Sequence, residues 1–187
     1  MSFRVVLADD ETLARSDLKE MLAEMGHKVV GAAADGVEAL HLIGTTDPDL
    51  VLLDIKMPGL DGIEVAGKIG SRCPAIILTA YSERNLLERA RDAGVMAYVT
   101  KPFRKADLAA AIELAVSNFL RQSTLRERVD RLKDQLETRK LVEKAKGLLM
   151  NAENLTEAQA HQRLLGISMS KNQPLKKVAK ATILMFE

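Results

Sequence analysis

Short apolar stretches alternate with amphipathic stretches along the first 119 residues of the chain. Residues 4–8 are apolar and largely β-branched, which predicts a short buried strand. Residues 11–25 carry apolar side chains at helical spacing, and Gly26 follows them as a stop signal. The face of this helix that we expect to be buried consists of Leu13, Leu18, Met21, Leu22 and Met25.

The same alternation recurs and predicts the fold class. Further strands are expected at 28–34, 50–54, 74–79 and 95–99. Further helices are expected at 36–44, 61–70, 83–92 and 104–119. Five strands alternating with five helices predict a doubly wound α/β domain, with a five-stranded parallel sheet covered on both faces.

Strand signals end near residue 119, and the remainder is predicted to be helical. No linker rich in Gly, Pro or Ser intervenes, so the helix at 104–119 is expected to run on. Apolar residues then recur at spacings of 4, 3 and 4, which is a short coiled-coil-like stripe. The stripe consists of Leu125, Val129, Leu132 and Leu136. It could pack on its own chain or pair with a second chain.

Three further helical segments are expected at 138–150, 156–166 and 174–185. Thr156 is a candidate cap for the second segment, and Pro174 suits the opening of the third. The predicted domains are therefore 1–120, a helical connector at 121–137, and a small three-helix all-α domain at 138–187.

Composition and charge restrict the class of protein. Hydrophobic residues make up 47% and charged residues 28% of the chain, no apolar run approaches the roughly 20 residues that span a bilayer, and the start has no signal-peptide pattern. The single cysteine, Cys73, cannot form an internal disulfide, so we expect a cytoplasmic protein that does not enter a membrane.

The net charge of +1 hides a split, because residues 1–118 carry −5 and residues 119–187 carry +6. The basic end is the one expected to approach a polyanion, although a lysine-rich helical surface would give the same charge.

Carboxylates and one lysine follow the predicted strands. Asp9 and Asp10 come after the first strand, Asp54 ends the third, Thr79 ends the fourth and Lys101 follows the fifth. In parallel sheets these positions converge on one edge. Clustered carboxylates repel one another unless a cation neutralises them, and hard oxygen ligands on an open site suit Mg²⁺. A carboxylate between a metal ion and an ammonium group is a plausible nucleophile for phosphoryl transfer, which makes Asp54 the candidate acceptor.

Four motifs in order resemble the response-regulator receiver family. They lie at residues 6–11, 50–62, 77–80 and 94–103, and the resemblance covers roughly residues 3–120. It implies a flavodoxin-like fold in which Asp54 accepts a phosphoryl group from a sensor histidine kinase. It also implies roles for matching residues: Mg²⁺ binding by Asp9, Asp10, Asp54 and the backbone carbonyl of Lys56, phosphoryl contacts by Thr79 and Lys101, a switch formed by Thr79 and Tyr98, and a cis peptide bond between Lys101 and Pro102.

Each of these residues has a simpler interpretation when it is taken alone. Asp61 is expected to cap a helix, and Tyr98 could be an ordinary core residue. Asp54 and Lys101 could form a buried ion pair. Their joint placement favours the functional interpretation.

The basic tail resembles the ANTAR family of three-helix RNA-binding domains, which act in transcription antitermination. The run Ala145-Lys146-Gly147-Leu148-Leu149-Met150, followed by Ala160, Leu164 and Val178-Ala179, carries the resemblance over roughly residues 125–185. His161 departs from it, because the family usually has a large aromatic residue there. The resemblance implies binding to RNA hairpins, often as a dimer, and we expect a homodimer on phosphorylation. The candidate RNA contacts are Arg139, Lys140, Lys144, Lys146, Arg163, Lys176 and Lys177.

The sequence therefore predicts a response regulator that is not an enzyme beyond its own phosphoryl uptake and loss. One alternative keeps the receiver but gives it a DNA-binding helix-turn-helix tail. A second is a Mg²⁺-dependent phosphatase that uses Asp54, although the first strand lacks an Asp-x-Asp pattern. A third is a protein-interaction adaptor with an inert tail.

Overall fold

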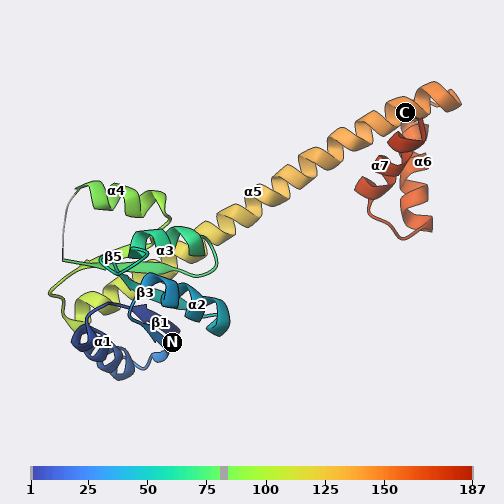
Figure 1. Ribbon diagram of the computed structural model, residues 1–187. Helices are drawn as coiled ribbons and strands as arrows, with labels where there is room; N and C mark the ends of the chain where they lie inside the picture. Colours follow the sequence, from blue (N-terminus) through green and yellow to red (C-terminus); the bar gives the residue numbers. More distant parts are fainter. Residues whose placement is uncertain (1, 81–83, 187) are drawn as a thin grey trace. The chain divides into compact units, whose positions relative to one another are not determined.

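The computed structural model describes residues 2–80 and 84–186, and the chain divides into two units. We call Met1–Ser123 the α/β unit and Thr124–Glu187 the helical unit (Figure 1). The α/β unit holds a parallel sheet in the order β2-β1-β3-β4-β5. Its strands are β1 (Arg4–Ala8), β2 (Lys28–Ala33), β3 (Leu50–Asp54), β4 (Ala75–Thr79) and β5 (Ala97–Thr100). The doubly wound flavodoxin-like fold is thus confirmed.

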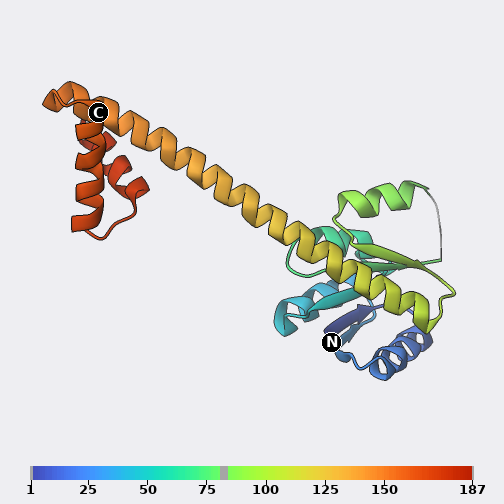
Figure 2. The same cartoon turned by 180° about the vertical axis from the view of Figure 1, so that it is seen from behind.

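Two apolar cores cover the two faces of this sheet. The helices that supply them are α1 (Thr12–Glu24), α2 (Gly36–Thr46), α3 (Gly62–Ile69), α4 (Arg84–Asp92) and α5 (Lys105–Glu153). Leu22 of α1 and Ile112 of α5 pack on one face, and Figure 2 shows the start of α5 lying across it. Ile43, Ile63 and Ala90 bring α2, α3 and α4 to the other face. Side chains of the central strands are buried on both sides, as expected of a parallel sheet.

The apolar face predicted for α1 is wrong at one position. Leu18 and Leu22 are buried against the sheet, whereas Leu13 is 80% exposed. Leu13 lies five residues before Leu18, which turns it about 140° away around the helix. Gly26 ends the helix as predicted: it has a φ of 79°, and its N–H donates to the carbonyl of Ala23.

Other element boundaries differ slightly from the predicted ones. Strand β5 begins at Ala97 and not at residue 95, because the N–H of Val95 still bonds the carbonyl of Ala90 at the end of α4. Residue 83, the predicted start of α4, lies outside the described residues. Asp61 caps α3 as predicted, in a capping box with Glu64.

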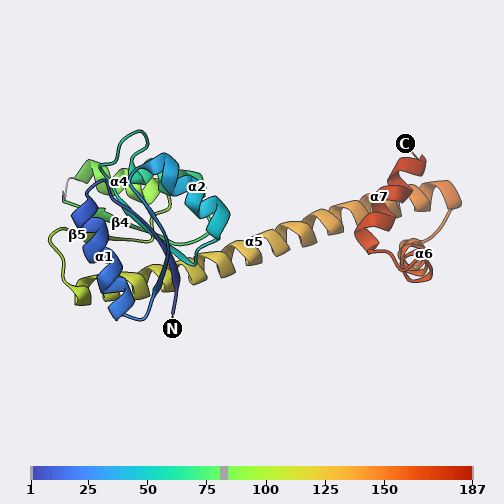
Figure 3. The ribbon, with the colours of Figure 1, turned by 60° about the horizontal axis from the view of Figure 1, so that its bottom comes forward.

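The helical unit consists of the last part of α5 with α6 (Glu157–Ser170) and α7 (Leu175–Phe186) (Figure 3). The segments predicted at 104–119, 121–137 and 138–150 belong to one continuous helix, α5. The core of the unit consists of Val142, Ala145, Leu149, Ala160, Leu164, Val178, Ala179 and Ile183. Thr156 caps α6 in a capping box with Gln159, as expected. Helix α6 continues four residues past its predicted end at Gly166, because Ile167 packs against this core and offsets the roughly 1 kcal/mol cost of a helical glycine.

Within residues 2–80 and 84–186, no helix is long and apolar enough to cross a membrane.

Candidate functional site

Lys101 joins two carboxylates at the carboxyl edge of the sheet. Its Nζ lies 2.6 Å from Oδ2 of Asp9 and 2.6 Å from Oδ1 of Asp54. Asp9 follows β1, Asp54 ends β3 and Lys101 follows β5, so the strand order brings together residues that are far apart in sequence. The Lys101–Pro102 peptide bond is cis.

The loop after β3 holds the carboxyl group of Asp54 in place. Asp54 is 7% exposed, and its Oδ2 accepts a hydrogen bond of 2.8 Å from the N–H of Lys56. The chain then returns at Gly62, whose N–H donates to the carbonyl of Ile55. A Cβ added at Gly62 would lie 2.1 Å from the carbonyl oxygen of Asp54, so only glycine fits this return.

The environment of Asp54 and Lys101 shifts both of their pKa values upward. Burial raises the pKa of Asp54, and the hydrogen bond and charge of Lys101 offset only part of that effect. Burial by itself would lower the pKa of Lys101, but hydrogen bonds to Asp54 and Asp9 and their charges raise it. Lys101 is therefore charged at neutral pH. Its charge partly offsets the cost of burying Asp54 as a carboxylate.

Thr79 and Asp10 are the other two predicted residues at the carboxyl edge of the sheet, and they differ in burial. Thr79 is buried at the end of β4, and its carbonyl accepts a hydrogen bond of 2.7 Å from the N–H of Lys101. Asp10 is exposed. The guanidinium group of Arg15 binds the carbonyls of Asp9 and Asp10, at 2.6 and 3.0 Å. Sequence reasoning missed Arg15, and its only signal was a basic residue one turn into the helix that follows the two aspartates.

The donors at this edge suit a hard cation such as Mg²⁺ in their chemistry. Mg²⁺ takes carboxylate and backbone carbonyl oxygens as ligands in proteins, and Asp10 is exposed to solvent. Across the described part of the chain, however, no three His, Cys, Asp or Glu side chains are grouped as a metal cluster. In this arrangement Lys101 supplies the positive charge between Asp9 and Asp54.

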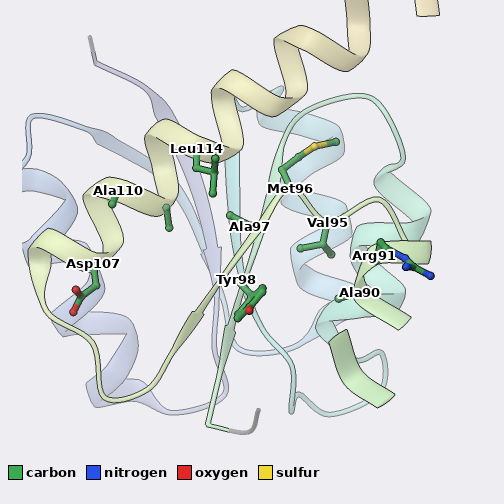
Figure 4. Close-up of a pocket in the computed structure, with 10 residues that line it drawn as sticks. Ala90, Arg91, Val95, Met96, Ala97, Tyr98, Asp107, Ala110 and Leu114 are labelled. Atoms are coloured by element: carbon green, nitrogen blue, oxygen red, sulfur yellow. The ribbon is translucent and has the colours of Figure 1, made fainter. Parts of the chain in front are cut away.

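Tyr98 lies on another face of the α/β unit. It is 54% exposed on β5, so the interpretation as an ordinary core residue is wrong. It lines an open groove of about 540 Å³ between α4 and α5 (Figure 4). Arg91 of α4 and Leu114 of α5 border the same groove. The side chain of Tyr98 is thus accessible from solvent, and its role as a switch residue stays a prediction.

The basic residues of the helical unit fall into two groups. Arg139, Lys140, Lys144, Arg163 and Lys177 are exposed. Lys146 is 6% exposed, and its Nζ lies 2.9 Å from Glu143 and 2.7 Å from Glu157. Lys176 is similarly engaged, with Asp134 at 2.6 Å and Glu137 at 2.7 Å.

The two ion pairs of Lys146 argue against the prediction that it contacts RNA. Its ammonium group ties α5 to the start of α6, and hydrogen bonds to Glu157 and Glu143 raise its pKa. Lys146 would have to leave Glu143 or Glu157 before it could bind a phosphate. Glu143 stands one helical turn before Lys146 in the sequence, but Glu157 comes from the next helix and gave no local signal.

Two family models match the chain. The model of the response regulator receiver domain matches residues 5–113, and the model of the ANTAR domain matches residues 130–183. The chain is 49% identical over 182 residues to the "Transcriptional regulatory protein PdtaR" of Mycobacterium tuberculosis, covering 96% of this chain and 89% of that protein. It is 33% identical to the "Sporulation initiation phosphotransferase F" of Bacillus subtilis, over 60% of this chain and 93% of that protein.

Solved structures resemble the α/β unit. A two-component response regulator of the LuxR family from Aurantimonas sp. SI85-9A1 superposes with a TM-score of 0.60 at 31% identity, over 69% of this chain and 99% of that one. A CheX-CheY-BeF3-Mg complex from Borrelia burgdorferi gives a TM-score of 0.56 at 25% identity, over 59% of this chain and 86% of that one.

Proposed function

Because the chain belongs to the response-regulator receiver family and carries an ANTAR domain, we propose that phosphorylation of Asp54 controls an output domain that binds RNA. The observation that supports the acceptor is the placement of Asp54, buried at the carboxyl edge of the sheet and 2.6 Å from Lys101. A transcriptional regulator that is 49% identical supports a role in transcription, which we propose to be antitermination.

The phosphoryl group would come from a phosphohistidine of a sensor histidine kinase. One carboxylate oxygen of Asp54 would bond to phosphorus while the phosphorus–nitrogen bond breaks, and the imidazole nitrogen would keep the electron pair and take up a proton. Lys101 would exchange its contact with Asp54 for one with a phosphoryl oxygen. Thr79, at the neighbouring strand end, is the proposed hydroxyl donor to another phosphoryl oxygen.

Mg²⁺ is the proposed cofactor. Asp9, Asp10, Asp54 and the backbone carbonyl of Lys56 would hold it at the carboxyl edge of the sheet. A bound divalent ion would neutralise charge on the carboxylates and on the phosphoryl oxygens.

The two families are not enzyme families in the ordinary sense. We propose that the only covalent chemistry is the uptake and loss of the phosphoryl group on Asp54. Catalytic turnover of a free phosphoester in the presence of Mg²⁺ would contradict this and revive the phosphatase alternative.

The RNA-binding face is proposed to lie on α5 around Lys140, Lys144 and Gly147. These residues share one side of the helix, and a Cβ added at Gly147 would meet no atom within 4 Å. A phosphate backbone can therefore approach closely there. Arg139, Arg163 and Lys177 are proposed as further contacts, whereas Lys176 would first have to leave Asp134 and Glu137.

Pairing of two chains on phosphorylation is proposed to use the groove beside Tyr98, whose borders include exposed Leu114.

Labelling with a small phosphodonor and Mg²⁺ tests the acceptor. We expect Asp54→Asn to abolish phosphoryl uptake while its circular dichroism stays that of the native protein. Asp92→Asn removes an exposed carboxylate of α4 and should leave uptake unchanged. Normal labelling of Asp54→Asn would refute the assignment.

Parallel titrations with a two-hairpin RNA and with duplex DNA of equal charge, at the same ionic strength, test the output. Tighter binding of RNA is expected, and it should weaken by about tenfold or more when Lys140 and Lys144 are both changed to Gln. The matched control changes Lys19 and Lys68 of the α/β unit to Gln, which alters the net charge equally. Tighter binding of DNA would favour the helix-turn-helix alternative, and binding of neither would favour the adaptor.

A further inference from the structure

The coiled-coil-like stripe on α5 is an exposed apolar surface within the helical unit. Leu125, Val129, Leu132 and Leu136 are 60%, 47%, 52% and 60% exposed. Four large apolar side chains in a row on one helix lose favourable burial when they face water. Such a row is typical of a surface that another helix covers.

The stripe does not belong to the core of its own unit. Along α5 the core residues Val142, Ala145 and Leu149 point about 140° away from the stripe around the helix axis. The positions that would continue this core face toward the stripe are Arg131, Asp134 and Thr138, none of which is apolar. Asp134 also binds Lys176 of α7, which places α7 on the side opposite the stripe.

Basic side chains flank the stripe on both sides. With the stripe residues at the a and d positions of a heptad, Arg126 and Lys133 fall at e, and Arg128 falls at g. All three are exposed, and none forms an ion pair with another residue in the part of the chain that the structure describes. The acidic side chains of the same segment, Glu127 and Asp130, lie more than 90° away from the stripe on the helix.

These flanks argue against a second copy as the occupant. In a parallel pair Arg128 of one chain would face Lys133 of the other, and in an antiparallel pair each basic flank would face its own equivalent. Each like-charged pair costs a few tenths of a kcal/mol, and a seam of two heptads offers little apolar area to offset several of them.

We propose that the stripe binds an amphipathic helix of a partner protein, whose apolar row is flanked by glutamates or aspartates. Apolar contacts with Leu125, Val129, Leu132 and Leu136 hold this helix, and charge pairing with Arg126, Arg128 and Lys133 selects it. This surface gives the protein a protein partner in addition to the kinase and the RNA of the proposed function. It does not depend on phosphorylation of Asp54.

Designed three-heptad peptides added to the full chain test the proposal. One peptide has Leu and Val at a and d with Glu at e and g, and its counterpart has Lys at e and g. We expect the acidic peptide to bind at least about tenfold more tightly, with an affinity that falls as salt is added. Equal binding of the two peptides, or no binding of the acidic one, would overturn the proposal.

Charge reversal on the chain sharpens the test. The double variant Arg128→Glu, Lys133→Glu should prefer the basic peptide. The matched control, Arg131→Glu with Lys171→Glu, changes the net charge equally at exposed positions away from the stripe and should keep the original preference. Leu132→Ser should abolish binding of the acidic peptide without loss of helix content, because Leu132 is exposed. Binding that survives Leu132→Ser would show a contact through charge alone and would contradict a docked helix.

Sedimentation of the full chain and RNA titration examine the other occupants. If the full chain self-associates at low or at moderate ionic strength, we expect the Leu132→Ser variant to self-associate to the same extent. We also expect Leu132→Ser to leave affinity for the two-hairpin RNA unchanged. A dimer that dissociates in Leu132→Ser would assign the stripe to a second copy, and loss of RNA binding in that variant would assign it to RNA; either result overturns the proposal.

Discussion

Lys101 contacts two buried carboxylates, yet it does not offset all of the electrostatic cost of Asp54. Burial raises the pKa of Asp54 by more than the Lys101 ammonium group lowers it. The folded state therefore takes up a proton on Asp54 more readily than the unfolded chain does. In such a case stability falls as the pH rises from the ordinary carboxyl value, about 4, through the raised one.

Asp54→Asn removes this titration and keeps the shape of the side chain. We expect the variant to be more stable than the wild type at neutral pH, because an uncharged amide costs less to bury than a carboxylate. The gain should shrink as the pH is lowered and the wild-type carboxyl group becomes protonated. Urea unfolding between neutral and mildly acidic pH measures both effects, and a gain that grows toward acid would contradict the raised pKa.

The loop after Asp54 has no room for a side chain at position 62. Gly62→Ala should destabilise the α/β unit by more than about 2 kcal/mol, because its Cβ would overlap the carbonyl oxygen of Asp54 and the backbone must shift. Gly44→Ala, inside α2 with no atom near its added Cβ, is the matched control and should be neutral or stabilising by up to about 1 kcal/mol. Chemical denaturation compares the two, and equal effects would show that the loop can relax.

At the scale of elements, local sequence signals were enough for most of the fold. Strand and helix order, the caps at Asp61 and Thr156 and the stop at Gly26 all follow from residues within a few positions of one another. The convergence of Asp9, Asp54 and Lys101 also followed, because the strand-end rule converts sequence order into proximity. Signals of this kind do not extend to contacts between elements. Two such contacts are the ion pair of Lys146 with Glu157 and the hydrogen bond from Arg15 to the carbonyl of Asp9. Both depend on how neighbouring segments pack.

The glycine inside helix α5 is expected to affect both stability and RNA binding. Gly147 lies in the interior of α5 with open space above it, so Gly147→Ala should raise the stability of the helical unit by about 0.5–1 kcal/mol. If RNA approaches this face closely, the same variant should bind the two-hairpin RNA less tightly. Gly166→Ala, which also meets open space on α6, should raise stability without affecting RNA binding. Thermal unfolding and RNA titration of both variants separate the two effects, and unchanged RNA affinity in Gly147→Ala would move the proposed face elsewhere.

At the scale of the whole molecule, the chain contains separate apolar cores. The clusters on the two sheet faces share no residue with the cluster of the helical unit. The two family models match separate ranges, 5–113 and 130–183. The domain limits expected from the sequence, at 120 and 138, stay a prediction, and the helix α5 that runs through them offers no break by which to place them.

A cavity in one core tests whether the two domains fold independently. Leu164 is fully buried in the helical unit, so Leu164→Ala should cost that unit about 2–5 kcal/mol. Phosphoryl uptake at Asp54 should persist in this variant, because its site is built on the other cores. Leu52→Ala, an equally buried change in the sheet, is expected to do the reverse, lowering uptake while the helical unit keeps its own unfolding transition. Calorimetry with parallel phosphodonor labelling distinguishes the cases. Loss of uptake in Leu164→Ala would mean that the domains unfold as one, and control of RNA binding by Asp54 would then follow from shared stability instead of from a switch.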